Sequence, residues 1–563
     1  MKQLIECVPN ISEGRDENII RQVTSVVETV EGVRLIDVDP GKATNRTVIT
    51  MVGTPEEVCE AAFRLVRKAS ELIDMRKHHG EHPRFGATDV CPLVPVSNIT
   101  MEETAEYARK LAKRIGGELS IPVYCYEFAA FKPERKNLAN CRKGEYEGLS
   151  DKLADPVWKP DFGPDQFNDQ VKKTGVTAVG ARNFLVAYNV NLNTTSTRRA
   201  NAIAFDVRER GRIKREGDPV TGKIIKDEQG NPVYEPGMLK SVKAIGWFIE
   251  EYGVAQISMN LTDITVTSVH KAFDAVCKSA DSRGVRVTGS ELVGVIPLKA
   301  MLDAGKHYLK KQQRSTGIPD REIIKIAVKS LGLDELGPFD PDKKIIEYLL
   351  EEKTASRLVN MTVKDFVYDT ASESPAPGGG SVSATMGAMG VALGTMVANL
   401  SSHKRGWDDR WEEFSDWAEK GKFYHDELLK MVDEDTRAFN RIMEAFGLPK
   451  NTEEDKLTRH TAIQDATRNA IEIPLKVMNL CYDSLEVMEA MALHGNPNSV
   501  SDAGVGAIAA LAGIKGAFLN VKINCGGFED KGFVREVTEK GQTILHKAEV
   551  LHDEILKIVE GKI

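Results

Sequence analysis

Three of the chain's eleven histidines lie within five positions, in the segment HHGEHPRFG that runs from His78 to Gly86. Imidazoles this close together can bind a metal ion, or one of them can serve as a general base. Gly80 and Pro83 argue against the continuous helix that would put metal ligands on one face, and no nearby cysteine or spaced aspartate completes a ligand set. The residues therefore favour a base at the edge of a cleft, or a solvated loop, over a metal site.

Three charged residues could assist such a base. Asp39, at the end of a predicted strand, could fix the tautomer of an imidazole, and Arg46 and Arg84 could hold substrate carboxylates. For each arginine the common alternative is a surface ion pair. The three are candidate supporting residues, and no metal ligand is predicted.

A second candidate lies in LLKMVDEDTRAFNRIMEAF, from Leu428 to Phe446. An apolar stripe with helical spacing would be formed there by Leu428, Val432, Phe439, Ile442 and Phe446. Asp435 falls on this stripe, whereas Asp433 points elsewhere around the helix. A carboxylate on a buried stripe is costly unless it is paired, and burial pushes its pKa upward. The pattern predicts either an acid-base catalyst or a structural carboxylate that caps a neighbouring helix.

Two glycine-containing segments could bind ligands. DFGPDQFNDQVKKTGVTAVGARNF (Asp161 to Phe184) is interpreted as a loop between two α/β halves, and it fits a ligand-binding loop and a plain linker equally well. SPAPGGGSVSATMG (Ser374 to Gly387) joins three glycines to a helix start, where backbone N–H groups attract anions. It is no Walker loop, because no Gly-Lys-Ser/Thr follows.

The elements that must position these residues form two α/β patterns and a helical region. The first pattern is strand, helix, strand, strand, helix, strand, at 4–9, 17–29, 34–39, 46–52, 55–74 and 90–96. The second repeats this order at 184–192, 197–210, 242–250, 255–261, 267–282 and 284–292. From about Glu351 to Ile563 nearly every long window has helical period.

This order predicts a multidomain protein: two α/β subdomains of the βαββαβ kind with antiparallel sheets, followed by an all-α helical domain. The expected boundaries are 1–181 and 182–345 for the two subdomains, 346–358 for a linker and 359–563 for the helical domain. Turn signals such as Asp218-Pro219 predict an exposed hairpin inserted at Lys214 to Glu235.

One uncharged stretch, VSATMGAMGVALGTMVANL at 382–400, is long enough to span a membrane. It is rich in small residues and poor in leucine, isoleucine and phenylalanine, so its transfer into lipid would be weakly favourable. We interpret it as a packed core helix, in which Gly387, Gly390 and Gly394 let a neighbouring helix approach. Membrane insertion is not expected.

Composition narrows the partners and the compartment. Lys and Arg total 75 against 83 Asp and Glu, a net charge of −8, and no long block of one sign occurs, so nucleic acid is not an expected partner. The eight cysteines are scattered without a CxxC pair, which is typical of a reducing compartment and not of a disulfide scaffold or zinc ribbon. A cytoplasmic location is expected.

Longer motifs add a resemblance to a known family. ECVPNISEG, DVDPGKATNRT, GEHPRFGATDVCP, and DFGP with GARNFL resemble, in order, the formimidoyltransferase domain of glutamate formimidoyltransferases. ASESPAPGGGSVSA, MVDEDTRAF and FGLPKNTEEDK resemble the formimidoyltetrahydrofolate cyclodeaminase domain that follows it. The resemblance covers essentially the whole chain.

The resemblance implies two reactions. The formimidoyl group of N-formimidoylglutamate passes to N5 of tetrahydrofolate, and the product cyclises to 5,10-methenyltetrahydrofolate with loss of ammonia. It also implies a polyglutamylated folate, no metal, a homo-oligomer and small-molecule substrates as the only other partners. The alternative is a formylglutamate/folate formyltransferase fused to a methenyltetrahydrofolate cyclohydrolase-like domain.

The resemblance also assigns residues. The histidine of the GEHPR motif is His82, as transferase base with a pKa expected near neutrality. The cyclodeaminase aspartate of the VDxD motif is Asp435, the residue that the helical stripe singles out. The family's folate loop corresponds to Gly163, Pro164, Asp165, Gln166, Phe167 and, near its uncertain far end, Gly175. The glycine turn gives a possible cyclodeaminase pocket at Gly378, Gly379, Gly380 and Ser381.

Overall fold

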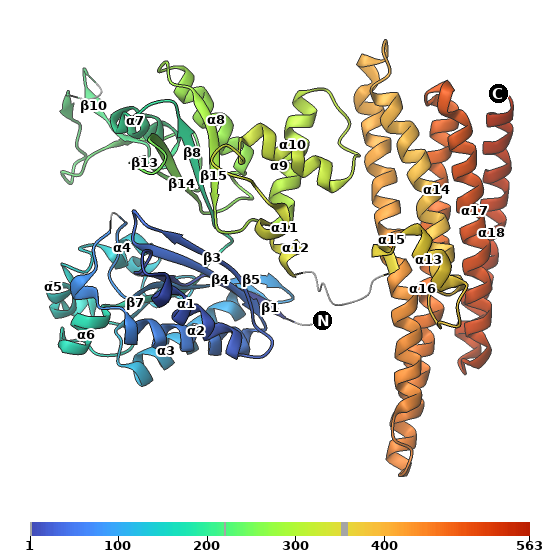
Figure 1. The fold of residues 1–563 in the computed structure, drawn as a ribbon, viewed down its shortest axis with the longest axis horizontal. Helices are drawn as coiled ribbons and strands as arrows, with labels where there is room; N and C mark the ends of the chain where they lie inside the picture. Colours follow the sequence, from blue (N-terminus) through green and yellow to red (C-terminus); the bar gives the residue numbers. More distant parts are fainter. Residues whose placement is uncertain (1–2, 81, 219–220, 351–357) are drawn as a thin grey trace. The chain divides into compact units, whose positions relative to one another are not determined.

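A computed structural model describes residues 3–80, 82–218, 221–350 and 358–563. The chain divides into two compact units (Figure 1). One unit consists of Met1–Ala304 with Ala327–Glu351, and the other of Gly305–Ile326 with Glu352–Ile563. The first holds both α/β subdomains, and the second holds the helical domain.

The first subdomain is a seven-stranded sheet with its long helices packed on one face, while a second, smaller core that includes Cys141 and Leu149 covers part of the other face. In spatial order the strands of this sheet begin with β3 (Arg34–Gly41) and β4 (Arg46–Gly53). The short strands β1 (Leu4–Cys7) and β2 (Asn10–Ile11) both lie between β4 and β5 (Thr88–Ser97), and β7 (Thr177–Ala181) and β6 (Val123–Glu127) follow. The covering helices are α1 (Glu17–Ser25), α2 (Pro55–Leu72) and α3 (Met101–Leu119). Alternate strand residues such as Ile49, Met51 and Cys91 pack beneath them in the core.

The predicted strands and helices of this subdomain are present, but the prediction was incomplete. It missed α3, which a capping box from Thr100 and Glu103 begins, and it missed β6. It also treated 161–184 as loop throughout, whereas β7 within it is a fully buried strand. β7 pairs in parallel with both β5 and β6, so the sheet is mixed and not wholly antiparallel. Because β7 contains small residues such as Ala178 and Gly180, its sequence lacks the run of large apolar residues by which a buried strand is usually recognised.

The second subdomain is a four-stranded antiparallel sheet, as predicted. Its order is β13 (Val242–Ile249), β14 (Val254–Leu261), β8 (Val186–Leu192) and β15 (Val287–Val293). Helices α7 (Thr197–Val207) and α8 (Val269–Asp281) lie on one face. The inserted hairpin is built from β9 (Arg212–Ile213) with β12 (Tyr234–Glu235) and β10 (Arg215–Glu216) with β11 (Lys223–Ile224). Pro219 of its predicted turn lies outside the described residues.

Short elements connect these parts. In the first subdomain they are α4 (Leu138–Arg142), α5 (Leu149–Ala154) and α6 (Asp169–Thr174). After β15 come α9 (Leu298–Lys311), α10 (Asp320–Leu331), α11 (Pro341–Lys344) and α12 (Ile346–Leu350). Residues 351–357 of the predicted linker 346–358 lie outside the described residues.

The C-terminal region is a bundle of long helices. They are α14 (Gly379–Ser402), α15 (Trp411–Gly447), α16 (Glu453–His494), α17 (Val500–Asn524) and α18 (Lys531–Glu560), preceded by the short α13 (Val363–Thr370). α15 and α16 form a hairpin whose loop end projects beyond the other helices (Figure 1). This all-α region confirms the sequence prediction.

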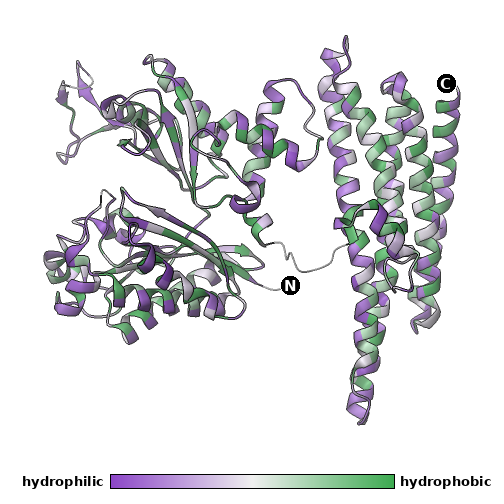
Figure 2. Ribbon diagram, in the orientation of Figure 1, coloured by the Kyte–Doolittle hydropathy of each residue, from purple (hydrophilic) through white to green (hydrophobic). Residues whose placement is uncertain are grey.

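Two helices of the bundle, α14 and α17, are long and apolar enough to cross a membrane by length and composition (Figure 2). In α14, 61% of the most apolar window is buried inside the protein. A Cβ on Gly387 would lie 2.3 Å from Cys481 Sγ, and one on Gly390 would lie 2.6 Å from the Gly506 carbonyl oxygen. The predicted small-residue packing of a core helix is therefore present.

Candidate active sites

His82 lies beside a buried cluster of two arginines and an aspartate. Arg46 and Arg142 both pair with the fully buried Asp89, with nitrogen–oxygen distances of 2.6 and 2.7 Å. The Nδ1 atom of His82 lies 2.7 Å from the carbonyl oxygen of Pro83. Burial, reinforced by the charges of Arg46 and Arg142, lowers the pKa of His82 to about 3. The imidazole is therefore neutral at physiological pH, but its pKa is far below the value near neutrality expected from the sequence.

The Asp89 cluster holds its charge despite its burial. Burial alone would raise the pKa of Asp89, but the two guanidinium groups hold that pKa below its usual value. Asp89 Oδ1 also accepts a 2.9 Å hydrogen bond from the amide of Phe85, in the histidine segment. Arg46 Nε donates to Asn10 Oδ1 at 3.0 Å. The cluster thus fixes the histidine segment against the sheet, and it carries one surplus positive charge.

Asp39 lies on the same sheet face as Arg46, but its hydrogen-bond partner belongs to the second subdomain and is not the ring of His82. Asp39 pairs with Val48 in the β3–β4 ladder, and Val48 and Arg46 project from the same side of β4, the face that the long helices leave uncovered. Its Oδ2 accepts a 3.0 Å hydrogen bond from the amide of Gly294, in the second subdomain. The structure therefore gives the His82 ring a backbone carbonyl as partner and places Asp39 where the two subdomains meet.

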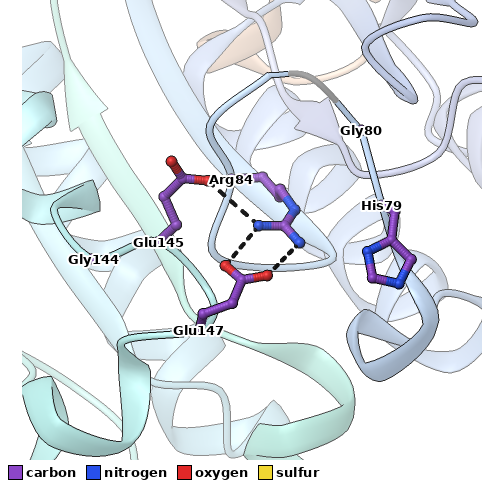
Figure 3. A pocket seen from close by; sticks show the side chains of 6 residues that line it. All are labelled: His79, Gly80, Arg84, Gly144, Glu145 and Glu147. Atoms are coloured by element: carbon purple, nitrogen blue, oxygen red, sulfur yellow. Dashed lines mark hydrogen bonds and ion pairs between the residues drawn. The ribbon is translucent and has the colours of Figure 1, made fainter.

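Arg84, within the histidine segment, lies at a surface pocket of about 500 Å³ (Figure 3). Its guanidinium forms hydrogen bonds of 2.9 and 2.7 Å to the carboxylate of Glu147. Its Nε donates to His78 Nδ1 at 3.3 Å, which leaves Nε2 of His78 to donate to the carbonyl of Asn45 at 2.7 Å. Arg84 and His78 thus stabilise the local fold, and Arg84 is engaged by a carboxylate of the protein itself.

The expected folate loop adjoins the histidine segment at its far end. Gly175 forms an isolated antiparallel bridge with Gly86, and the amide of Val176 donates to the carbonyl of Phe85 at 2.9 Å. A Cβ on Gly175, whose φ is +65°, would lie 2.2 Å from that same carbonyl oxygen. Only glycine fits this approach. The loop and the histidine segment are therefore close although they are far apart in sequence.

The start of this loop is anchored by Asp161, just before Gly163. Its carboxylate pairs with the buried Arg135 and accepts a 2.8 Å hydrogen bond from the amide of Cys125. Asp165 pairs with Lys159 at 2.9 Å, and the ring of Phe167 packs edge-on against Tyr146 at 6.2 Å. Gly163 and Gln166 are exposed and Pro164 is partly exposed, so a ligand can reach the loop.

In the helical unit, Asp435 of α15 meets the N-terminus of α14. Its Oδ2 accepts hydrogen bonds from the amide of Ser381 at 2.9 Å and from the Ser381 hydroxyl at 3.2 Å. Burial raises the pKa of Asp435, although both bonds to Ser381 oppose the rise. A Cβ on Gly380 would lie 2.0 Å from Asp435 Oδ1, so the glycine turn makes room for the carboxylate. The structure thus joins the predicted Gly378 to Ser381 turn to Asp435.

The apolar stripe that singled out Asp435 is only partly buried. Leu428 and Val432 are buried as predicted, but Phe439 and Phe446 are 41% and 51% exposed. The reason is that α15 continues into the projecting end of its hairpin with α16, where fewer helices cover it. Asp433 does point elsewhere, as predicted: its Oδ1 accepts a 2.8 Å hydrogen bond from the amide of Leu358.

Sequence reasoning missed several residues of these sites. Asp89 and Asn10 lie within the quoted motifs GATDVCP and ECVPN, but Arg142 lies in no quoted motif. Asn520 of α17 lies beside the glycine turn, since a Cβ on Gly379 would be 3.3 Å from its Nδ2. None of these has a spacing that relates it to His82 or Asp435, so only the fold could bring them together. In the described residues, no three or more His, Cys, Asp or Glu side chains gather into a metal-binding group.

Known protein families match the two α/β subdomains and the helical domain in order. Residues 4–182 match the model of the formiminotransferase domain, N-terminal subdomain; residues 187–351 match that of the formiminotransferase domain; residues 362–543 match that of formiminotransferase-cyclodeaminase. Formimidoyltransferase-cyclodeaminases of Dictyostelium discoideum and Gallus gallus are 41% and 42% identical over 100% of both chains. A methenyltetrahydrofolate cyclohydrolase of Methylorubrum extorquens is 37% identical over 36% of this chain and 98% of its own.

Proposed function

Because the chain belongs to the formimidoyltransferase-cyclodeaminase family, we propose that it is a bifunctional enzyme of one-carbon folate metabolism. It transfers the formimidoyl group of N-formimidoylglutamate to N5 of tetrahydrofolate. It then cyclises 5-formimidoyltetrahydrofolate to 5,10-methenyltetrahydrofolate and releases ammonia, a lyase reaction. The observation that carries this proposal is the match to these relatives over the full length of both chains.

In the transferase step, His82 serves as the base. N5 of tetrahydrofolate attacks the formimidoyl carbon, His82 accepts the N5 proton, and the departing glutamate nitrogen takes a proton back. The ring is neutral and so has a nitrogen free to accept a proton, but with a pKa of about 3 it is a weak base until an anionic donor offsets the charges of Arg46 and Arg142. The two positive charges of Arg46 and Arg142 exceed the single negative charge of Asp89, so these arginines provide cationic groups for the substrate carboxylates. Asp39 provides a carboxylate on the same sheet face. The loop from Gly163 to Gly175 contacts the folate.

In the cyclodeaminase step, Asp435 moves protons. N10 attacks the same formimidoyl carbon, a proton leaves N10, and the former imino nitrogen must gain protons to depart as ammonia. A carboxyl group whose pKa is raised by burial can serve as both acid and base in this exchange. Ser381 fixes its position, and the first turn of α14 supplies backbone N–H groups for the substrate.

Tetrahydrofolate, polyglutamylated in the cell, is the shared substrate, and neither step as written uses a metal. We place the enzyme in the cytoplasm, which its scattered free cysteines support. The small-molecule substrates are its expected ligands, without nucleic acid or membrane insertion.

We further propose a homo-oligomer formed through α14 and α17. Outward-facing apolar residues recur at spacings of four and three along α14, and Met389 and Met396 among them are 54% and 38% exposed. Ile508 and Leu519 of α17 are 51% and 66% exposed, and Gly516 between them lies against Met386 of α14. One continuous apolar face suits a second copy. Replacing Met389 and Ile508 by glutamate should lower the mass measured by light scattering; an unchanged mass would contradict this interface.

One assay tests the two activities. The purified protein is incubated with tetrahydrofolate and either formimidoylglutamate or formylglutamate, while methenyl absorbance and ammonia are followed together. Production of both from the formimidoyl donor supports the proposal. Transfer from formylglutamate, with cyclisation that releases no ammonia, would instead support the formyltransferase and cyclohydrolase alternative, which the Methylorubrum relative keeps relevant.

A further inference from the structure

The second subdomain presents an uncovered sheet face that is strongly polar. Helices α7 and α8 pack on the other face, as shown by Gly246, whose added Cβ would lie 2.2 Å from the amide of Asn201 in α7. The uncovered face carries the alternate residues, among them Asn189, Asn191, Gln256 and Glu291, which are paired across β8, β14 and β15. Neither α7 nor α8 covers these residues, and on an isolated domain they would be exposed to water. Here, however, the side chains of Asn189, Asn191 and Gln256 are almost fully buried.

Two of the buried amides donate to Glu291, whereas Asn191 Nδ2 donates to Glu335 at 2.6 Å. Oε2 of Glu291 accepts hydrogen bonds from Asn189 Nδ2 at 3.0 Å and Gln256 Nε2 at 3.2 Å, and its Oε1 accepts one from the Tyr252 hydroxyl at 3.1 Å. Gln256 is held in turn by Asn191, at 2.7 Å, and by the indole N–H of Trp247, at 3.1 Å. The Glu291 carboxylate is thus fixed on the face and remains partly exposed.

This carboxylate faces the first subdomain, on the side of Asp39. The amide of Gly294, just after the strand that carries Glu291, donates to Asp39. Burial raises the pKa of Tyr252, and the charges of Glu291 and Asp39 add to the rise, so the phenol lies near both carboxylates. At the far strand of the same face, Lys243 Nζ lies 3.5 Å from Asn137 Oδ1 of the first subdomain.

We propose that Glu291 determines specificity for the pterin ring of tetrahydrofolate, an inference that rests on the proposed transferase function. A carboxylate offers about four acceptor positions and three are used, which leaves one on Oε1 for a ligand donor. The aminopyrimidinone edge of a pterin carries such donors in its 2-amino group and N3–H. The half-buried indole of Trp247 and the side chain of Ile245, 50% exposed on the same face, offer a flat surface for the ring.

The donor substrate fits this face poorly. Formimidoylglutamate carries two carboxylates, which a fixed glutamate repels, whereas the arginines beside Asp89 on the other sheet attract them. The two uncovered sheet faces therefore divide recognition, with the pterin on the second subdomain and the amino-acid carboxylates on the first.

The test uses the full-length chain with two acceptors, tetrahydrofolate and its 2-desamino-2-methyl analogue, which lacks the amino donor. For the wild type, the analogue should raise KM by about 10- to 100-fold while kcat changes little, since one hydrogen bond to a charged group is lost. Glu291→Gln should raise KM for tetrahydrofolate by a similar factor. It should also reduce discrimination between the two acceptors, because a neutral amide oxygen accepts a weaker hydrogen bond than a carboxylate, and a merely structural role would not change this readout.

Undiminished discrimination in Glu291→Gln, or equal KM values for both acceptors in the wild type, would overturn the proposal. The comparison of KM for the two acceptors with the wild-type protein still tests the proposal if the variant fails to fold. Glu250→Gln is the matched control, because this exposed glutamate of the same subdomain carries the same charge, and it should keep full discrimination. Absence of any transfer by the wild type, with acceptor discrimination preserved in direct binding, would reject the proposed function and leave the pterin site standing.

Discussion

The amide of Ser381 donates a 2.9 Å hydrogen bond to Oδ2 of Asp435, so that a carboxylate of α15 caps the N-terminus of α14. The two interpretations offered by the sequence, a cap and an acid-base group, therefore concern the same atoms. The cap fixes the carboxylate, and burial keeps its pKa raised. The hydrogen bonds that fix Asp435 are therefore compatible with the acid-base role proposed for it.

Replacing Asp435 by asparagine should abolish cyclodeamination and spare transfer. The amide keeps the size of the side chain but cannot exchange a proton, so kcat should fall by about 100-fold or more. Ammonia release from 5-formimidoyltetrahydrofolate measures the loss. Asp433→Asn is the matched control on the same helix, because Asp433 bonds to Leu358 instead, and it should keep the activity. Full activity of Asp435→Asn with an intact fold would refute the assignment.

Gly380→Ala should displace Asp435 without changing its chemistry. The added Cβ would lie 2.0 Å from Oδ1, so either the carboxylate or the first turn of α14 must shift. We expect a loss of about 1–3 kcal/mol in the free energy of unfolding and a fall in cyclodeaminase kcat. Chemical denaturation and the ammonia assay measure both. Gly447→Ala, where a Cβ meets nothing within 4 Å, should change neither.

His82→Gln should abolish transfer and spare cyclodeamination. The glutamine amide cannot accept a proton at a useful rate, so transfer should fall by about 100-fold or more. Single-turnover transfer from formimidoylglutamate measures the loss, and added 5-formimidoyltetrahydrofolate measures the other activity. Near-normal transfer in this variant would remove His82 from the mechanism.

The ring of His82 should not titrate in the free protein between about pH 5.5 and 8. Burial and the charges of Arg46 and Arg142 hold its pKa at about 3, whereas an unperturbed histidine titrates near 6.5. Selective isotope labelling of histidine gives the measurement, and the signal missing from His82→Gln identifies the ring. A midpoint near 6.5 for that signal would contradict the electrostatic description of the site.

Glu6→Gln should stabilise the protein more at about pH 8 than at about pH 5. Burial raises the pKa of Glu6 from 4.5 to about 7, although Arg182 opposes the rise. The folded state therefore favours the neutral acid, and its advantage is lost as pH rises from 4.5 to about 7, because the unfolded chain ionises first. The substitution should recover on the order of 3 kcal/mol at about pH 8. Thermal melts at both pH values measure it; equal shifts at both would count against the raised pKa.

Local patterns could predict the parts of each site that depend on a single element. The helical spacing around Asp435 singled out that residue, and Gly80 with Pro83 indicated the loop at His82. The partners could not be predicted, because Ser381 lies 54 positions from Asp435 and because Asp89 and Arg142 reach His82 only through the mixed sheet. The exposure of Phe439 and Phe446 was missed because helical period continues past the point where neighbouring helices end.

Arg46 and Arg142 share the single carboxylate of Asp89, and this imbalance of charge has a thermodynamic consequence. A dianionic donor that binds there offsets the excess positive charge and makes protonation of His82 easier. Linkage is reciprocal, so donor binding should take up protons, and donor affinity should rise, as pH falls toward the pKa of His82 in the complex. The basicity of His82 is then a property of the complex and not of the free protein. In the proposed mechanism, binding of the donor thus raises the basicity of the residue that accepts the proton from tetrahydrofolate.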